Sequence, residues 1–550
     1  MRDRDPVEKL TTHDVLNQAT PFEDVNLYDT DTALVEAVRR EGGAADRLSA
    51  LGARVGSADV QDWAQQANRH PPKLKVFDRY GRRLDEVEFH PDWHRLMALG
   101  LEAGVASVAW QPGQGGHVTH AAMLYLLTQA DAGVCCPFSM TYASIPALRC
   151  EPDVAREWEP RVLAARYDPR SVPAAGKSGV TIGMAMTEKQ GGSDVRANTT
   201  RAERCSDDGG FELTGHKWFC SAPMSDAFLA LGRTDAGLSC FLVPRWRPEG
   251  TRNAIRLMRL KDKLGDRSNA SAEIEYDGAW ARLVGDEGHG VRTILQMVQG
   301  TRLDCLAGSS GLMRAALANA IHHCRQRRAF GCRLIRQPAM ARVLADLALE
   351  QEAALALTFR VARAFDDAGA SEEAAALARV LTPIAKYWGC KRAPGFIYEA
   401  MECLGGNGYV EESPLPRLYR QAPVNSIWEG SGNVIALDAL RAIEDHPPAL
   451  AALFSALDEA RGSDDRLDRL VRNLETEAGE LGEASARHFV ETVGVAFAAA
   501  TLVETAPPFV AEAFVRTRLA GEGGYTYGAW QEGIDPEPML ARASGPQAGS

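Results

Sequence analysis

One carboxylate, Glu429, stands in a setting that suits acid–base chemistry. It follows an aliphatic and an aromatic residue, Ile427 and Trp428, and precedes a glycine-rich turn. Apolar neighbours disfavour a charged carboxylate, which raises its pKa toward the range where it can exchange protons near neutrality. The alternative interpretation is a helix that starts after a loop, with Ser431 or Asn433 as its cap.

Four segments together carry residue types that could hold a flat, phosphate-bearing cofactor, and the Glu429 turn follows the last of them. The run from Met184 to Asp194 combines glycines and hydroxyls at the end of a predicted strand, and His216–Ser221 offers an aromatic wall for stacking. Arg327, at a predicted helix end, can bind a phosphate bidentately. Leu404–Tyr409 is rich in glycine. Each also has a purely structural interpretation: a strand turn, a core tryptophan, a basic helix end and a helix-terminating glycine pair.

The composition is that of a globular protein with several domains. The chain has 550 residues, of which 45% are hydrophobic and 24% charged, enough for three or four cores of ordinary size. The formal net charge of −12 argues against non-specific binding to nucleic acid or to anionic membranes, so such contacts need a local basic patch.

The cysteines and the apolar stretches favour a reduced, cytoplasmic protein. The eleven cysteines are scattered apart from Cys135-Cys136, without paired C-x-x-C spacing, so we predict neither a metal site nor a disulfide framework. Met1–Leu10 is charged and does not resemble a signal peptide. The most apolar stretch, about Val493–Val503, is too short to span a membrane and predicts a buried helix, so we expect no membrane contact.

The elements that must position these residues follow a simple order. Apolar residues at helical spacing dominate residues 1–177, and short strand-like runs follow in residues 178–285, with Ala272–Tyr276 the clearest alternation. Helical patterns resume in residues 286–446. After the break at His446-Pro447-Pro448, residues 447–550 predict an extra helical unit. The fold class is therefore mainly α with a central β domain.

In this order the motifs resemble the acyl-CoA dehydrogenase family of flavoproteins, and more specifically its AidB branch of alkylation-response proteins. The linking phrases Leu283–Gly290 and Gly300–Arg302 support the family, and Asn253–Ser271 and Pro423–Asn433 look like the branch. The resemblance covers essentially the whole chain. It implies an N-terminal helical domain, a β-barrel, a C-terminal four-helix bundle and an extra helical domain, assembled as a homotetramer.

The resemblance also implies FAD as the cofactor, with a set of residues around it. The flavin ring would be contacted by Thr187 and its neighbours and by the segment from Trp218, while Arg327 and Phe330 would hold the adenine end of FAD in a neighbouring subunit. The residues matched to FAD binding are Met184, Met186, Thr187, Ser193, Trp218, Phe219, Cys220, Ser221, Arg327, Phe330, Glu402, Gly405, Gly406, Ile427, Trp428, Gly430, Ser431 and Asn433.

In this family the catalytic base occupies the position of Glu429. A minority of members place the base at the position of Thr301, which has no basic group, so the resemblance leaves Glu429 as the candidate. Two departures suggest a flavin that is bound but less reactive. Cys220 stands where the dehydrogenases usually carry a threonine, and a thiol is a weak donor. Glu402 replaces a glutamine near the diphosphate and needs neutralising, for which Arg327 is a candidate.

The AidB branch implies binding of duplex DNA through the C-terminal unit, but the local charge opposes it. Beyond Pro447 the chain has eight arginines, no lysine and sixteen acidic residues. One stripe at helical spacing remains, with one more arginine before it in the chain. Its members are Arg441, Arg466, Arg469 and Arg472. The alternative interpretation, which we favour, is a solvated face balanced by Asp464, Asp465 and Asp468.

Three functions remain open from the sequence. The chain could be an enzyme that oxidises a short or branched acyl-CoA with Glu429 as base. It could be an FAD-binding protein of the DNA alkylation response with weak dehydrogenase activity and DNA binding, the role that the resemblance favours. It could also be a flavin-binding scaffold whose oligomer matters more than turnover.

Overall fold

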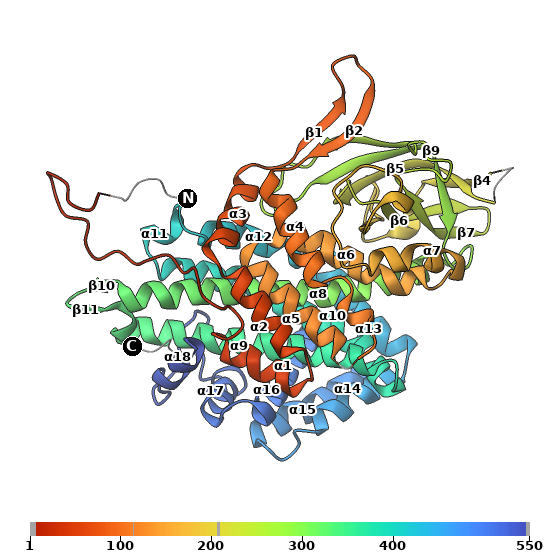
Figure 1. The fold of residues 1–550 in the computed structure, drawn as a ribbon. Helices are drawn as coiled ribbons and strands as arrows, with labels where there is room; N and C mark the ends of the chain where they lie inside the picture. Colours follow the sequence, from red (N-terminus) through yellow and green to blue (C-terminus); the bar gives the residue numbers. More distant parts are fainter. Residues whose placement is uncertain (1–6, 114, 206–208, 546–550) are drawn as a thin grey trace.

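The structure is a computed structural model that describes residues 7–113, 115–205 and 209–545. We predict from the sequence that Met1–Leu10 is not a signal peptide. Residues 1–6 of this stretch lie outside the described range. Figure 1 shows a β-rich unit at one corner, long helices that cross the middle of the molecule, and shorter helices on either side of them.

The N-terminal unit is built around two buried helices, α5 (Gly116–Ala130) and α6 (Ala132–Leu148). Asp131 separates them and caps α6, since its carboxylate accepts the Val134 N–H at 3.2 Å. Nearly every residue of both helices is buried, as expected of helices covered on all faces. The surrounding elements are α1 (Thr32–Arg40), α2 (Ala45–Val55), α3 (Ala58–Arg69), α4 (Pro91–Ala103), α7 (Pro152–Val162) and the short turns η1 (Val108–Trp110) and η2 (Ala174–Gly176).

A β-hairpin interrupts this unit where the sequence analysis expected only helices and loops. Strands β1 (Lys73–Phe77) and β2 (Arg83–Glu88) pair antiparallel, and Asp78 closes the turn by accepting two backbone N–H groups at 2.8 and 2.9 Å. Asp85 accepts the Leu257 N–H at 2.8 Å, which fixes the hairpin to the central β domain. The alternation of the two short runs is visible in the sequence but was outweighed by the helical pattern around it.

The central domain is a closed barrel with its own core. The strand order β3-β6-β4-β5-β9-β7 returns on itself because β7 also pairs with β6, and β8 adds to β9. Phe211, Phe241 and Tyr276 lie in its interior. The predicted strand runs and the barrel are confirmed. The strands are β3 (Ile182–Ala185), β4 (Arg201–Arg204), β5 (Phe211–Ser221), β6 (Ala227–Thr234), β7 (Gly237–Pro244), β8 (Ile255–Leu260) and β9 (Ser271–Leu283), with η3 (Val195–Ala197) between β3 and β4.

The second helical unit contains three long helices, α8 (Gly290–Gln326), α9 (Pro338–Asp367) and α10 (Glu372–Glu402). Helix α8 packs directly on α6 at Gly300, where an added Cβ would lie 2.9 Å from the Ala143 Cβ. The smaller elements are α11 (Gly406–Tyr409), α12 (Leu415–Asn425), α13 (Gly432–Asp445), the hairpin β10 (Arg328–Ala329) and β11 (Cys332–Arg333), and η4 (Leu334–Arg336).

The C-terminal unit packs against α9 and α10. Helix α16 is long and apolar enough to cross a membrane by length and composition, but most of its residues are buried among neighbouring helices, as in the core of a folded domain. The elements are α14 (Pro448–Asp458), α15 (Asp465–Glu477), η5 (Ala478–Glu480), α16 (Ala486–Thr505), α17 (Pro508–Arg518) and α18 (Glu537–Ala543).

Candidate functional site

The acidic turn joins α12 to α13 and bends sharply at its carboxylate residue. Glu429 has φ +57°, a left-handed conformation that is uncommon outside glycine, and Gly430 follows with φ +107°. Ser431 is the N-cap residue of α13, as the helix-start interpretation expected, but its side chain makes no capping hydrogen bond. A left-handed conformation at such a residue persists only where the surrounding structure imposes it.

Two buried cations hold this turn in place. The Lys386 ammonium, from α10, donates to the carbonyl oxygens of Trp428 at 2.8 Å and Gly430 at 2.6 Å. The Arg302 guanidinium, from α8, donates through Nε to the Glu429 carbonyl oxygen at 3.0 Å. Both cations are almost fully buried. Three consecutive carbonyl groups are therefore held by charge-assisted hydrogen bonds, which are about twice as strong as neutral ones.

The Glu429 carboxylate itself is supported by one hydroxyl. Thr301 Oγ1 lies 2.9 Å from Glu429 Oε2 and 3.0 Å from the Val298 carbonyl oxygen. Because a hydroxyl carries one proton, Thr301 can donate to the ionised carboxylate, or donate to Val298 while it accepts from the protonated acid. Burial raises the pKa of Glu429, and the Thr301 hydroxyl, Lys386 and Arg302 oppose part of that rise. Such a carboxylate is suited to removing a weakly acidic proton near neutrality.

The other predicted residues of the turn are anchored on its two sides. The Trp428 indole N–H donates to Asn425 Oδ1 at 3.1 Å, while Ile427 is exposed. Asn433 Oδ1 accepts from Arg487 Nη1 at 3.3 Å, which links the turn to the C-terminal unit.

A bulge in β5 turns two aromatic side chains to the same outer face. The pairing of β5 with β9 shifts between Lys217 and Cys220, and both of these side chains point into the barrel. The two residues between them, Trp218 and Phe219, therefore face outward, and their rings meet edge to face. The Lys261 ammonium lies 3.2 Å from the centroid of the Trp218 ring. The structure thus provides an aromatic wall with a lysine ammonium over one face of its Trp218 ring.

The loop that follows β3 lies next to this wall. The Trp218 N–H donates to the Thr187 carbonyl oxygen at 2.8 Å. Met184 is buried, Met186 and Thr187 are half-buried, and Ser193 is exposed. Among the residues that the structure describes, the hydroxyls of Thr187 and Ser193 have no protein partner, so both are available to a ligand.

A buried ion pair fixes this loop to the barrel. Glu188 and Lys217 are fully buried and lie 2.9 Å apart. Burial alone would raise the pKa of Glu188, but Lys217 and hydrogen bonds from Thr199 and Thr200 hold that pKa well below its usual range. Because all these donors converge on one carboxylate, the loop position depends on Glu188 remaining ionised.

The end of β5 brings the aromatic wall and the acidic turn together. Ser221 Oγ lies 3.3 Å from Ser271 Oγ and is hydrogen-bonded to the Cys136 thiol of α6. Burial raises the pKa of Cys136 to about 12, and the nearby Glu429 carboxylate contributes to this rise. The end of β5 therefore meets α6 at Cys136, and the Glu429 carboxylate lies close enough to act on this thiol electrostatically.

The structure corrects the expectation for Cys220. Its thiol is fully buried in the barrel core, and burial raises its pKa to about 12, so it does not face the aromatic wall. The hydroxyl that contacts the helical unit, at Cys136 of α6, belongs to Ser221. The inference that a weak thiol donor replaces a flavin-facing hydroxyl here is therefore wrong, and a hydroxyl is present one residue later.

A second group of predicted residues gathers at the opposite end of α8. Arg327 is the C-cap residue of α8, and Phe330 forms the tip of the β10–β11 hairpin with 97% of its side chain exposed. Cys324 Sγ lies 3.6 Å from the Cys403 carbonyl oxygen, so the end of α10 is adjacent. That end carries Glu402, Gly405 and Gly406.

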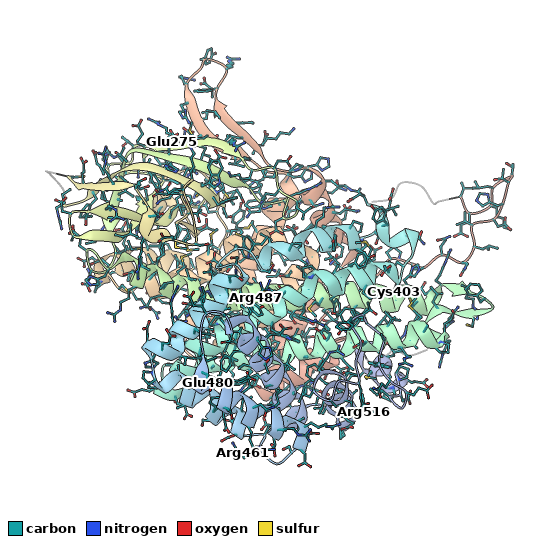
Figure 2. The ribbon with its side chains drawn as sticks, turned by 180° about the vertical axis from the view of Figure 1, so that it is seen from behind. Glu275, Cys403, Arg461, Glu480, Arg487 and Arg516 are labelled. Atoms are coloured by element: carbon teal, nitrogen blue, oxygen red, sulfur yellow. The ribbon has the colours of Figure 1, made fainter. Side chains whose placement is uncertain are left out.

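The two groups are far apart within one chain. Thr301 and Arg327 are separated by about 39 Å along α8, at about 1.5 Å per residue. Figure 2 shows Glu275 on the barrel and Cys403 toward the opposite end of the long helices. Glu402 forms no ion pair with Arg327 in the described part of the chain, since the Arg327 guanidinium donates to the Asn17 carbonyl oxygen.

The arginine stripe of the C-terminal unit is only partly free. Arg466 is paired with Asp464 and with Glu512, both at 2.6 Å. Arg441, Arg469 and Arg472 are exposed, and no ion pair involves them in residues 7–113, 115–205 and 209–545. Figure 2 shows neighbouring charged residues of this unit, Arg461 and Glu480, pointing outward. The interpretation that acidic residues balance the arginines on a solvated face is correct for Arg466.

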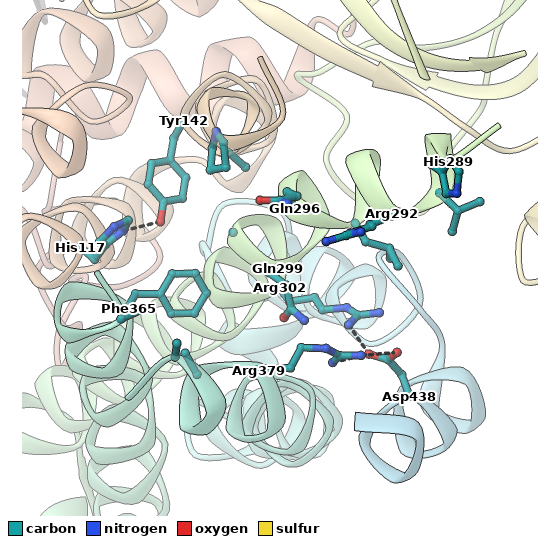
Figure 3. Close-up of a pocket in the computed structure, with 18 of the residues that line it drawn as sticks. His117, Tyr142, His289, Arg292, Gln296, Gln299, Arg302, Phe365, Arg379 and Asp438 are labelled. Atoms are coloured by element: carbon teal, nitrogen blue, oxygen red, sulfur yellow. Dashed lines mark hydrogen bonds and ion pairs between the residues drawn. The ribbon is translucent and has the colours of Figure 1, made fainter. Parts of the chain in front are cut away.

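Sequence reasoning missed the cations that organise the site. Lys386 and Lys217 each stand in apolar stretches, and a lysine in such a stretch is a signal for a buried partner. The local sequence around Arg302 gives no sign of its role, and none singles out Asp438, which accepts from Arg302 Nη1 at 2.6 Å (Figure 3). In the described residues no group of three histidine, cysteine or acidic side chains is arranged to hold a metal ion.

Comparison with known proteins assigns consecutive parts of the chain to one family. Residues 17–169 match the model of the adaptive response protein AidB N-terminal domain, residues 183–279 the acyl-CoA dehydrogenase middle domain, and residues 288–443 its C-terminal domain. AidB of Escherichia coli strain K12 is 47% identical over 518 residues, which cover 93% of this chain and 95% of that protein. The chain is an AidB-like member of the acyl-CoA dehydrogenase family.

Further relatives agree with this assignment. Acyl-CoA dehydrogenase family member 11 of Caenorhabditis elegans is 30% identical over 496 residues, covering 84% of this chain and 80% of that protein. The crystal structure of C. elegans ACDH-11 in complex with C11-CoA superposes with a TM-score of 0.84 at 28% identity, over 94% of both chains. The structure of the apo form of Bd2924 superposes with a TM-score of 0.81 at 32% identity, over 89% of this chain and 99% of that chain.

FAD is the cofactor of this acyl-CoA dehydrogenase family member, and the residues present fit it. The exposed Phe219 ring offers an aromatic surface, although Lys261 covers one face of the neighbouring Trp218 ring. The hydroxyls of Thr187 and Ser193 are unpartnered within the described chain. At Gly191 an added Cβ would meet no atom within 4 Å, so this part of the loop is open to its surroundings. Trp218, Phe219 and Ser221 would hold the ring.

The clamp on the acidic turn leads to a first prediction. Lys386→Met leaves two partly buried carbonyl oxygens without this donor, at about 1–3 kcal/mol each, so we expect the free energy of unfolding to fall by about 2–6 kcal/mol. Urea denaturation measures this. Lys73→Met makes the same chemical change at an exposed site in β1, far from the turn, and should change this free energy by less than about 0.5 kcal/mol. Equal effects of the two substitutions would contradict the clamp.

Proposed function

We propose that this protein removes two hydrogens from the α and β carbons of an acyl-CoA thioester, with Glu429 as the base. The observation that carries the proposal is the Glu429 turn: a carboxylate of raised pKa on a strained backbone, held by Lys386 and Arg302 near the aromatic wall. When bound, FAD accepts the hydride that leaves the β carbon.

The protein groups supply the proton chemistry and the orientation. Glu429 Oε takes the α proton as the C–H bond breaks, and the Thr301 hydroxyl then shifts its own proton from the carboxylate to the Val298 carbonyl. Neither protonation state of Glu429 is left without a partner. Because the backbone carbonyls of the turn are fixed, the carboxylate does not need to be reoriented for each turnover, which is the main advantage of a positioned base.

We also infer a homo-oligomer, in which a tetramer is the arrangement expected from the family. Arg327 and Phe330 lie too far from the aromatic wall of their own chain to share one FAD with it. Phe330 is 97% exposed, with φ +50°, so a large apolar side chain is held in solvent by a strained tip. A neighbouring subunit that covers this tip would remove the apolar surface from water and complete the cofactor site.

The first test of the activity is anaerobic. Butyryl-CoA or isovaleryl-CoA should bleach the bound flavin of the wild-type protein, and Glu429→Gln should slow bleaching by about 10²–10⁴-fold while FAD remains bound. Glu412→Gln makes the same chemical change at an exposed site and should leave the rate unchanged. The proposal fails if the wild-type protein is not bleached by short, branched or medium-length acyl-CoA.

The pH dependence of bleaching tests the role of Thr301. Only ionised Glu429 can act as a base, so the rate should rise with pH through a pKa above the ordinary value of about 4.3 for glutamate. Thr301→Val removes a hydrogen-bond donor that favours the ionised form of Glu429. The rise of the bleaching rate with pH should therefore move to still higher pH. Thr301→Ser keeps the hydroxyl and is the control. If the rate of Thr301→Val rises with pH over the same range as that of the wild-type protein, the base is a different group.

A role in the cytoplasmic response to DNA alkylation, with weak dehydrogenase activity and binding of duplex DNA, is the second candidate. It is supported by the AidB-like sequence and by the exposed side chains of Arg441, Arg469 and Arg472, which have no ion pair in the described residues. The acidic surroundings oppose it, because phosphate binding needs clustered cations.

Gel retardation at low salt distinguishes this candidate. If the stripe binds DNA, Arg469→Glu should weaken retardation of a short duplex, and raising the salt concentration should weaken it further. Arg461→Glu is a suitable control, because Arg461 is already neutralised by Asp458 at 2.5 Å and Glu475 at 3.1 Å. Absence of retardation at low salt would rule out this function.

A further inference from the structure

The loop between β8 and β9 carries a lysine, Lys263, at the boundary between the barrel and the helices. The loop is wedged between α12 and the junction of α5 and α6. A Cβ added at Gly265 would lie 2.2 Å from the Arg420 carbonyl oxygen of α12, and Ser268 Oγ donates to Asp131 Oδ2 at 2.6 Å. The loop therefore has no room to move toward either element, and the position of Lys263 is fixed.

The Lys263 ammonium points at the start of β9. Its Nζ donates to the Asn269 carbonyl oxygen at 2.9 Å and to Ser271 Oγ at 3.1 Å. Burial lowers the pKa of Lys263, and the neighbouring Asp266 carboxylate opposes that shift and favours the charged form. An ammonium has donors and no acceptor, so both hydrogen bonds run away from Lys263.

Ser271 passes this direction on to Ser221. The two serines stand opposite each other where β5 pairs with β9, and opposed side chains in antiparallel strands lie on the same face. Their Oγ atoms are 3.3 Å apart, and either could donate on distance alone. Because Ser271 Oγ already accepts from Lys263, its own proton is free, and in the described part of the chain Ser221 Oγ is the acceptor within its reach. The hydrogen bonds therefore run from Lys263 through Ser271 to Ser221.

The proton of Ser221 is left for a group beyond these three residues. Among the residues that the structure describes, its acceptor is the Cys136 sulfur, and a thiol sulfur accepts weakly. Burial raises the pKa of Cys136 to about 12, so this sulfur stays an uncharged thiol near neutrality. The edge of a flavin ring carries nitrogen and carbonyl oxygen acceptors that are stronger. Ser221 follows the aromatic wall along β5, so its hydroxyl is suited to donate to that edge.

We propose that Lys263 is a positioning residue for the bound flavin, which acts through Ser271 to make Ser221 a donor to the ring. Reduction of FAD by two electrons with uptake of one proton leaves a negative charge on the ring at neutral pH. A donor whose direction is fixed in advance favours that charged state over the neutral oxidised ring. Lys263 therefore makes the flavin easier to reduce. This role needs FAD beside Ser221, as the proposed function does, but it does not need acyl-CoA as the substrate.

The reduction potential of the bound FAD tests this role in the full-length protein. Anaerobic reduction by xanthine and xanthine oxidase against a reference dye measures it without acyl-CoA. Lys263→Met and Ser271→Ala should each lower the equilibrium constant for two-electron reduction at least about tenfold, which is about 30 mV toward negative potential. Lys263→Arg keeps the charge and the donors and should stay within about threefold of the wild-type protein. Lys73→Met, at an exposed site in β1, is the control and should change nothing.

A double variant separates a directed chain from two independent effects. Lys263→Met and Ser271→Ala interrupt the same chain, so together they should shift the potential about as far as the larger single change, and not by the sum. Ser271→Ala keeps the lysine and its bond to the Asn269 carbonyl oxygen, so the role remains testable even if Lys263→Met does not fold.

Three results would overturn the proposal: an unchanged potential in Ser271→Ala, additive shifts in the double variant, or loss of FAD from Ser271→Ala. If the potentials shift as expected but no acyl-CoA bleaches the flavin, the proposed dehydrogenase function fails and the role of Lys263 stands.

Discussion

The functional site depends on two buried cations that bind three consecutive carbonyl groups. Lys386 and Arg302 come from two different long helices, α10 and α8, and they meet at the turn from Trp428 to Gly430. A left-handed glutamate is unfavourable by itself, and such a conformation persists only where the surroundings impose it. The helices therefore do more than form a core: their mutual packing determines where the carboxylate points.

A similar arrangement supports the cofactor side of the site. The buried pair of Glu188 and Lys217 fixes the loop after β3, and the bulge in β5 directs Trp218 and Phe219 outward together. Regular alternation would have placed one of these rings in the barrel core. In both halves of the site a buried charge on a rigid element positions a loop that carries the chemistry, so the reactive groups themselves can remain partly exposed.

Much of this could be predicted from the sequence, and the failures have physical causes. The order of helical and strand units and the acidic turn follow from local patterns and from the motifs. The hairpin from Lys73 to Glu88 was missed because its strands are short and a helical pattern surrounds them. The position of Cys220 was misjudged because a bulge changes which side chains face outward, and a bulge depends on pairing with β9. The roles of Lys386 and Asp438 depend on contacts across long sequence separations, which no local pattern contains.

The length of α8 has a consequence for how the protein retains its cofactor. This 37-residue helix carries the contact to the base at Thr301 and, at its other end, the arginine and the hairpin proposed to bind the adenine of a neighbour. A site completed by two chains obeys mass action, since anything that binds only the assembled form also stabilises the assembly. The apparent affinity for FAD would then rise with protein concentration, and dilution would release cofactor and subunits together.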